Sequence, residues 1–178
     1  MSVFRVGLSQ TLSRSGNELK MPTFSDGAAS LRLAMMLHAT SIDEVVKWAD
    51  AEIESCDKPP IALIELSLGR SLPSANILNY LSELIADPND STPMRIALGM
   101  LATKIVAEDL NPESVIQDVY NLLHTEGVIN DVPFVAFWGL AEDLSLIRDG
   151  ILGNDRLVQL RSDTMDTLWG IANLNEDA

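Results

Sequence analysis

From about residue 27 onward, apolar side chains recur at the three- and four-residue spacing that is typical of amphipathic helices. The clearest such segment begins at Ser41, where Ser41 and Glu44 have the spacing of a capping box. Its apolar positions share one helical face: Ile42, Val45, Val46, Ala49, Ile53 and Cys56. Pro59 and Pro60 follow, and prolines of this kind end a helix. The pattern therefore predicts a helix that runs from Ser41 toward the two prolines.

Similar signals predict further helices along the rest of the chain. An apolar segment over 61–68 is followed by Gly69, which is typical of a helix C-terminus. Asn111 and Pro112 combine a capping side chain with a first-turn proline. A last helix is predicted over 155–172, and sustained strand-like alternation is lacking. We therefore expect an all-α fold, with about eight helices in a single compact domain.

The N-terminal segment differs in composition from the rest of the sequence. Residues 1–17 contain Arg5 and Arg14, four serines and no acidic residue. They lack the long apolar run of a secretory signal. We expect a loosely structured N-terminal arm over 1–26, followed by a helical domain over 27–178.

Two stretches of the sequence resemble each other, namely residues 31–37 (LRLAMML) and residues 94–101 (MRIALGML). A capped amphipathic helix is predicted after each, at Ser41 and at Asn111, and a proline with an apolar segment comes next. This order favours two stacked helical units of solenoid-like character. The alternative is the self-similarity that helical bundles share in general.

The net charge of the chain limits the classes of partner that it can bind. It contains 12 Lys and Arg residues against 26 Asp and Glu residues, which gives a net charge of −14. Nucleic-acid binding requires clustered Lys and Arg, so no nucleic-acid partner is expected. No apolar run approaches the roughly 20 residues of a membrane-spanning helix. We expect a cytoplasmic protein whose acidity favours a basic protein partner. The alternative is that the acidic residues serve only to keep the protein soluble.

Known catalytic and metal-binding motifs are absent from the sequence, among them HExxH, CxxC, GxSxG and GxxxxGK. The single cysteine, Cys56, excludes an internal disulfide and is expected to be buried. His38 is expected in the core, with a buried acid–base group as the alternative, and His124 on the surface. Trp138 and Trp169 lie in apolar contexts and are expected in the core. The sequence therefore predicts no catalytic residue, no metal and no cofactor.

One local feature stands above this background, the acidic helix predicted from Ser41. Its acidic residues, against Lys47 alone, are Asp43, Glu44, Asp50, Glu52, Glu54 and Asp57. On a helical wheel Asp43, Lys47, Asp50 and Glu54 share the outer face, and Trp48 stands at the boundary, about 100° from the centre of the apolar face. An aromatic ring beside acidic groups can anchor an interface with a basic protein. The predicted partner-binding site consists of Asp43, Trp48, Asp50 and Glu54, unless Trp48 simply packs against a neighbouring helix.

Residues 48–50 (WAD), 59–60 (PP) and 64–67 (IELS) resemble small bacterial helical proteins. Some of those are similar to immunity proteins of polymorphic or contact-dependent toxin systems. The resemblance implies a cytosolic inhibitor that binds a cognate toxin domain, often a basic nuclease, and masks its active site. The N-terminal arm with its serines and arginines departs from that pattern.

We therefore expect a non-catalytic acidic module that binds a basic protein, with a toxin domain as the partner that the resemblance implies. One alternative is a helical scaffold or adaptor that binds peptides between stacked helices. The other is an enzyme whose carboxylates converge from separate helices.

Overall fold

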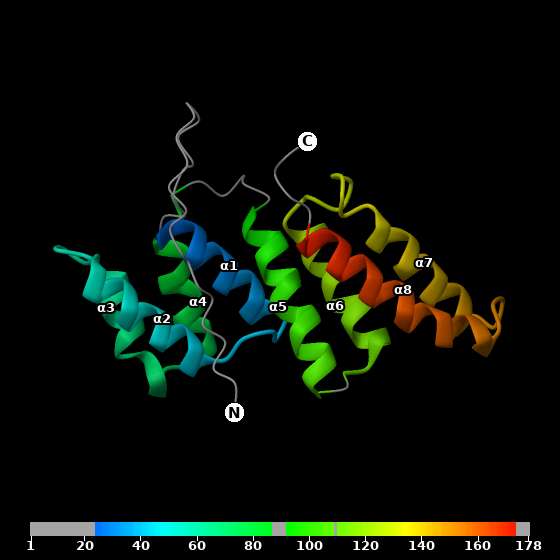
Figure 1. The fold of residues 1–178 in the computed structure, drawn as a ribbon, viewed down its shortest axis with the longest axis horizontal. Coiled ribbons are helices and arrows are strands. Elements are labelled where there is room, and N and C mark those ends of the chain that lie inside the picture. The colour runs from blue at the N-terminus through cyan, green and yellow to red at the C-terminus, as the bar shows by residue number, and fades with distance from the viewer. Residues whose placement is uncertain (1–23, 87–91, 109, 174–178) are drawn as a thin grey trace.

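The computed structural model describes residues 24–86, 92–108 and 110–173, in which the chain forms eight α-helices, a short 3-10 helix and no strand (Figure 1). The predicted all-α fold is thereby confirmed. In chain order the elements are α1 (Phe24–Met36), α2 (Ile42–Ser55), α3 (Ile61–Ser67), η1 (Gly69–Ser71), α4 (Ser74–Glu83), α5 (Thr92–Glu108), α6 (Pro112–Thr125), α7 (Ala136–Arg148) and α8 (Asn154–Ala172). None of the helices in the described ranges is both long and apolar enough to cross a membrane.

The predicted N-terminal arm falls largely outside the part of the chain that the structure describes, which starts at residue 24. Helix α1 begins there, at Phe24, three residues before the domain boundary that the sequence suggested. The Ser25 hydroxyl accepts a hydrogen bond from the Ala86 N–H at 2.9 Å, so the first turn of α1 is tied to the end of α4.

The two helix starts predicted from capping residues are confirmed. At α2, the Glu44 N–H donates to the Ser41 hydroxyl at 3.3 Å, and the Ser41 N–H donates to the Glu44 carboxylate at 2.9 Å. This is a complete capping box, which satisfies backbone N–H groups that the first helical turn leaves without partners. At α6, the Glu113 N–H donates to the Asn111 side chain at 2.9 Å, and Pro112 is the first helical residue.

The apolar side chains form two core clusters. The first lies among α1 to α4 and includes Ala28, Leu31, Val45, Ala49, Leu63, Leu66, Ile77 and Leu81. The second lies among α5 to α8 and the other side of α1, and includes Leu33, Ala34, Leu37, Leu98, Ile116, Phe134, Phe137, Leu144 and Leu160. Helix α1 therefore contributes to both clusters from different faces.

The helices of the two halves pack in the same order. In the first half α1 packs on α4, α2 on α3, and α3 on α4. In the second half α5 packs on α8, α6 on α7, and α7 on α8. The halves are joined by extensive packing of α1 on α5, near the middle of the molecule in Figure 1. This arrangement agrees with the two stacked helical units that the sequence suggested.

Small side chains line the contact between α1 and α5. Ala34 of α1 and Ala97 and Ala102 of α5 belong to the same core cluster, and each is 0% exposed. Alanine lets two helix backbones approach closely while keeping high helix propensity. The sequence of α5 is apolar almost all round, and the helix packs on both α1 and α8.

The prediction that Trp138 and Trp169 belong to the core is wrong. Their side chains are 54% and 39% exposed. Each tryptophan follows a fully buried residue, Phe137 or Leu168, and adjacent helical residues point about 100° apart. The prediction considered only the apolar neighbours of the two tryptophans and not their position on the helix, and it therefore placed both rings in the core.

The prediction that His38 is a core residue is also wrong. Helix α1 ends at Met36, so His38 lies in the turn beyond it, exposed and in the left-handed region at φ 55°. Its carbonyl accepts a hydrogen bond from Lys104 Nζ at 2.7 Å. His124 is exposed as expected, whereas Cys56, expected to be buried, is only half-buried at the C-cap of α2.

The Trp48 ring of α2 packs against Gly27 of α1. A Cβ atom placed on Gly27 would lie 2.9 Å from the indole nitrogen of Trp48 and 3.1 Å from its Cζ2. The half-buried ring therefore occupies the space that a side chain at position 27 would need. Glycine at this helical position is explained by the close approach.

We expect Gly27→Ala to lower the free energy of unfolding by about 1 kcal/mol, because the methyl group forces the indole out of its place. Gly139→Ala in α7 is the matched control, since no atom lies within 4 Å of the added Cβ. That control should gain about 0.5–1 kcal/mol from helix propensity. Urea unfolding of both variants measures the difference, and equal stabilisation by the two substitutions would contradict the packing role of Gly27.

Candidate functional site

The three predicted acidic residues lie together on the outer face of α2. Asp43, Asp50 and Glu54 are all exposed, and they stand opposite the buried face of Val45 and Ala49. Their spacing of seven and four residues places them along one side of the helix. We call Asp43, Asp50 and Glu54 the acidic face of α2.

Lys47 lies on the same side of α2 as these carboxylates, but within the described residues it forms no ion pair with any of them. Arg70 approaches Asp43 at 3.9 Å, but both side chains are largely exposed, so the pair contributes little. Within the described part of the chain, no Lys or Arg forms an ion pair with Asp50 or Glu54. The Asp50 carboxylate instead accepts a hydrogen bond from the hydroxyl of Ser67 in α3. The acidic face therefore keeps its negative charge toward solvent.

Trp48 lies on a different side of α2 from the acidic face. Its indole packs against Gly27 and the first core cluster, and its side chain is half-buried. Asp50 is two positions further along the helix, on the side toward α3. The structure thus groups the three carboxylates, and places the tryptophan in a contact within the fold.

A row of exposed apolar residues on α3 was not predicted. Ile61, Ile64 and Leu68 are 79%, 40% and 72% exposed, and their spacing places them on one side of the helix. We call these three residues the α3 stripe. Segment 61–68 is mostly apolar, and Glu65, its only charged residue, lies on the same side as the stripe. Apolar residues on both sides of the helix leave its core face undecided by the pattern alone. Figure 1 shows α3 beside α2 at one end of the molecule.

Glu44 belongs to the first turn of α2 and has a perturbed carboxyl group. Burial raises the pKa of Glu44, but hydrogen bonds from the Ser41 N–H and from the Thr40 and Ser41 hydroxyls lower it by more. The net effect is a pKa below the usual range for glutamate. The side chain accepts these bonds at 2.9 Å, 2.9 Å and 3.1 Å respectively, so it serves the helix cap.

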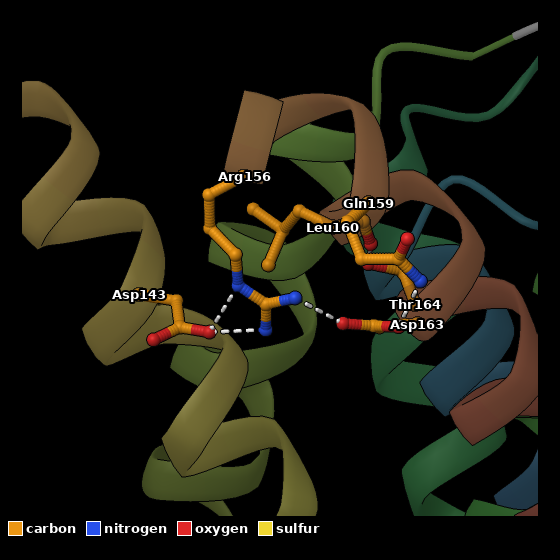
Figure 2. Close-up of polar contacts among 6 residues, drawn as sticks. All are labelled: Asp143, Arg156, Gln159, Leu160, Asp163 and Thr164. Atoms are coloured by element: carbon orange, nitrogen blue, oxygen red, sulfur yellow. Dashed lines mark hydrogen bonds and ion pairs between the residues drawn. The ribbon is translucent and has the colours of Figure 1, made fainter. Parts of the chain in front are cut away.

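The carboxylates between α7 and α8 differ from Asp50 and Glu54 on α2 because both form ion pairs with one arginine. Arg156 donates to Asp143 of α7 through Nε at 2.9 Å and through a second nitrogen, and to Asp163 at 2.6 Å (Figure 2). Hydrogen bonds from Gln159 and from Arg156 lower the pKa of Asp163. These groups join two helices, and their charges are not free to attract a partner.

A small cavity brings together residue types that are used in nucleophilic catalysis. It has a volume of about 170 Å³, and its lining includes His38, Ser114 and Asp118. The Ser114 hydroxyl donates to the Asn111 carbonyl at 2.9 Å. Within the described residues no hydrogen bond joins the serine, the histidine and the aspartate to one another. The three side chains share a cavity and do not form a triad.

Among the described residues, no three His, Cys, Asp or Glu side chains are grouped so that they could hold a metal ion.

Comparison with known proteins gives no family model, no curated protein and no solved structure that matches this chain. The acidic face of α2 and the adjoining α3 stripe are therefore the candidate site.

We expect Glu44→Gln to lower stability at pH 7 by roughly 0.5 kcal/mol, since the amide accepts weaker hydrogen bonds than the carboxylate. The folded-state pKa lies below the unfolded value, so the ionised group stabilises the fold at neutral pH. This contribution is lost as the pH falls through the folded-state pKa. Urea unfolding at pH 7 and pH 3 should show the difference between variant and wild type shrinking in acid.

Glu54→Gln in the same helix is the control, because it leaves the capping box intact. A deficit of Glu44→Gln that stayed constant between pH 7 and pH 3 would show that its charge does not stabilise the cap.

Proposed function

We propose that this protein is a non-catalytic acidic module that binds a basic protein partner through the acidic face of α2. The observation that carries the proposal is the contrast between two groups of carboxylates. Asp143 and Asp163 both form ion pairs with Arg156, whereas no cation in the described residues pairs with Asp50 or Glu54. Unpaired exposed carboxylates on a rigid helix attract and orient a partner of opposite charge.

The overall charge supports a basic protein as the partner. A chain with a net charge of −14 repels nucleic-acid phosphates, and it also repels anionic membrane surfaces. A protein with clustered Lys and Arg gains long-range attraction instead, which raises its association rate. The resemblance of residues 48–67 to immunity-type proteins favours a toxin domain as this partner, met in the cytoplasm and inhibited when its active site is covered.

A helical scaffold is the second candidate function. It is favoured by the matching order of helix contacts in the two halves, because stacked helical units present extended binding surfaces. A scaffold would bind peptides or several partners, whereas a dedicated inhibitor would bind one protein stoichiometrically.

Affinity capture with the tagged full-length chain from its native lysate distinguishes these functions. We expect one basic protein at low salt in stoichiometric amount, with recovery reduced at high salt because charge screening weakens the attraction. Several unrelated partners would favour the scaffold. Recovery that does not change with salt would contradict the electrostatic proposal.

We expect the double variant Asp50→Asn and Glu54→Gln to slow association with the captured partner about 3- to 10-fold at low salt. Asparagine keeps an oxygen that can accept the Ser67 hydrogen bond, so the contact between α2 and α3 is preserved. Stopped-flow or biosensor measurements over a range of salt concentrations should also give a shallower salt dependence for the variant.

The matched control is Glu142→Gln with Asp166→Asn, which removes two exposed negative charges from α7 and α8. Its net charge equals that of the α2 variant. If the two double variants slowed association equally, total charge rather than the acidic face of α2 would direct the partner.

A further inference from the structure

The α3 stripe is an apolar surface that the fold leaves uncovered. Ile61 and Leu68 are 79% and 72% exposed, while Leu63 and Leu66 on the opposite side of the same helix are at most 1% exposed. Helix α3 therefore has one apolar side in the core, and its solvent side carries the three stripe residues around a half-buried Glu65. Exposed apolar residues grouped on one helical face are typical of an interaction site.

The stripe adjoins the acidic face of α2. The chain between the two helices, over 56–60, is short, and α2 and α3 pack against each other as an antiparallel pair. Asp50 and Ser67 are hydrogen-bonded, which fixes the register of the pair. Glu54 lies one turn after Asp50 in α2, and Ile64 lies one turn before Ser67 in α3. In the antiparallel pair these two residues are therefore at the same height along the helix axes.

We propose that the α3 stripe and the acidic face of α2 together bind an amphipathic helix that carries basic residues along one flank of its apolar face. The inference rests on the proposed function and specifies the binding element of the partner. The apolar side chains of that helix cover Ile61, Ile64 and Leu68. Its Lys or Arg residues then lie above Asp50 and Glu54, where no cation of the described chain pairs with either carboxylate.

Charge complementarity selects this occupant over two others. In a two-fold dimer the same patch meets itself, so the acidic faces of the two copies would be brought close and would repel each other. An anionic membrane surface would likewise repel the carboxylates beside the stripe. A basic amphipathic helix can cover the α3 stripe with its apolar side chains and pair its basic side chains with the carboxylates of α2.

The probe is a fluorescein-labelled peptide of about 18 residues, long enough to form a helix, with leucines at helical spacing and lysines on one flank. A second peptide replaces every lysine by glutamate. We expect the lysine peptide to bind the full chain with a Kd of about 10–100 µM at low salt. The glutamate peptide should bind at least about 10-fold more weakly. Equal binding of the two peptides, or no binding of the lysine peptide, would overturn the inference.

The α3 stripe is tested by Ile61→Ser with Leu68→Ser. The matched control, Val106→Ser with Val158→Ser, alters residues that are 69% and 79% exposed on α5 and α8. We expect the stripe variant to weaken binding of the lysine peptide about 10-fold and the control less than 2-fold. All four side chains are mostly exposed, so both variants should keep the wild-type circular dichroism spectrum and melting temperature.

Two other results would also overturn the inference. One is a wild-type dimer in analytical ultracentrifugation that the stripe variant abolishes, since a second copy would then cover the stripe. The other is binding to phosphatidylserine vesicles that the stripe variant loses.

Failure of this inference is distinguishable from failure of the proposed function. If partner association is slowed by Asp50→Asn with Glu54→Gln but unchanged by the stripe variant, the acidic module stands and the docked helix does not. If neither variant changes partner association, both are overturned.

Discussion

The packing of α1 against α5 constrains the rest of the molecule, because both helices must be apolar on more than one side. Helix α1 places Leu31 in the first core cluster and Leu33 in the second. Little of its circumference is then left for charge, and Arg32 occupies part of it, paired with Glu126 at 3.2 Å. The fully buried alanines at this contact allow the two halves to share a pair of helices.

Placing the shared pair in the middle moves the more polar helices outward. Helix α2 packs on α3 at one end of the molecule, and α6 and α7 pack together in the other half. With 12 basic residues for 26 acidic ones, most carboxylates cannot find an internal cation. Those that join helices have one, as Glu113 does with Arg148 at 3.8 Å and Asp143 does with Arg156. The charge of the acidic face of α2 is left over from this pairing, which is why it is available to a partner.

The sequence predicted the helices well where local chemistry decides the outcome. The capping box at Ser41 and the side-chain cap at Asn111 depend on residues only two or three positions apart, so their patterns specify the structure directly. The acidic face of α2 follows from the helical period alone. These features needed no knowledge of how the helices pack.

The sequence failed where burial depends on which helices meet. Trp138 and Trp169 stand in apolar stretches, yet they point away from the core. His38 was assigned to a helix that in fact ends two residues earlier. Segment 61–68 carries apolar residues on both sides, with Glu65 as its only charged residue, so tertiary packing decides that Leu63 is buried and Ile61 is exposed. The α3 stripe therefore could not be predicted from the sequence, whereas the acidic face of α2 could.

The matching order of contacts in the two halves also bears on how the chain folds. Apart from α1 on α5, the closely packed helix pairs lie within one half of the sequence. Contacts between segments near in sequence need little loop-closure entropy and form early. Each four-helix half can therefore assemble around its own apolar cluster before the two dock. Until they dock, the alanine-lined sides of α1 and α5 remain open to water, so the half-assembled chain exposes an apolar surface that the native protein hides.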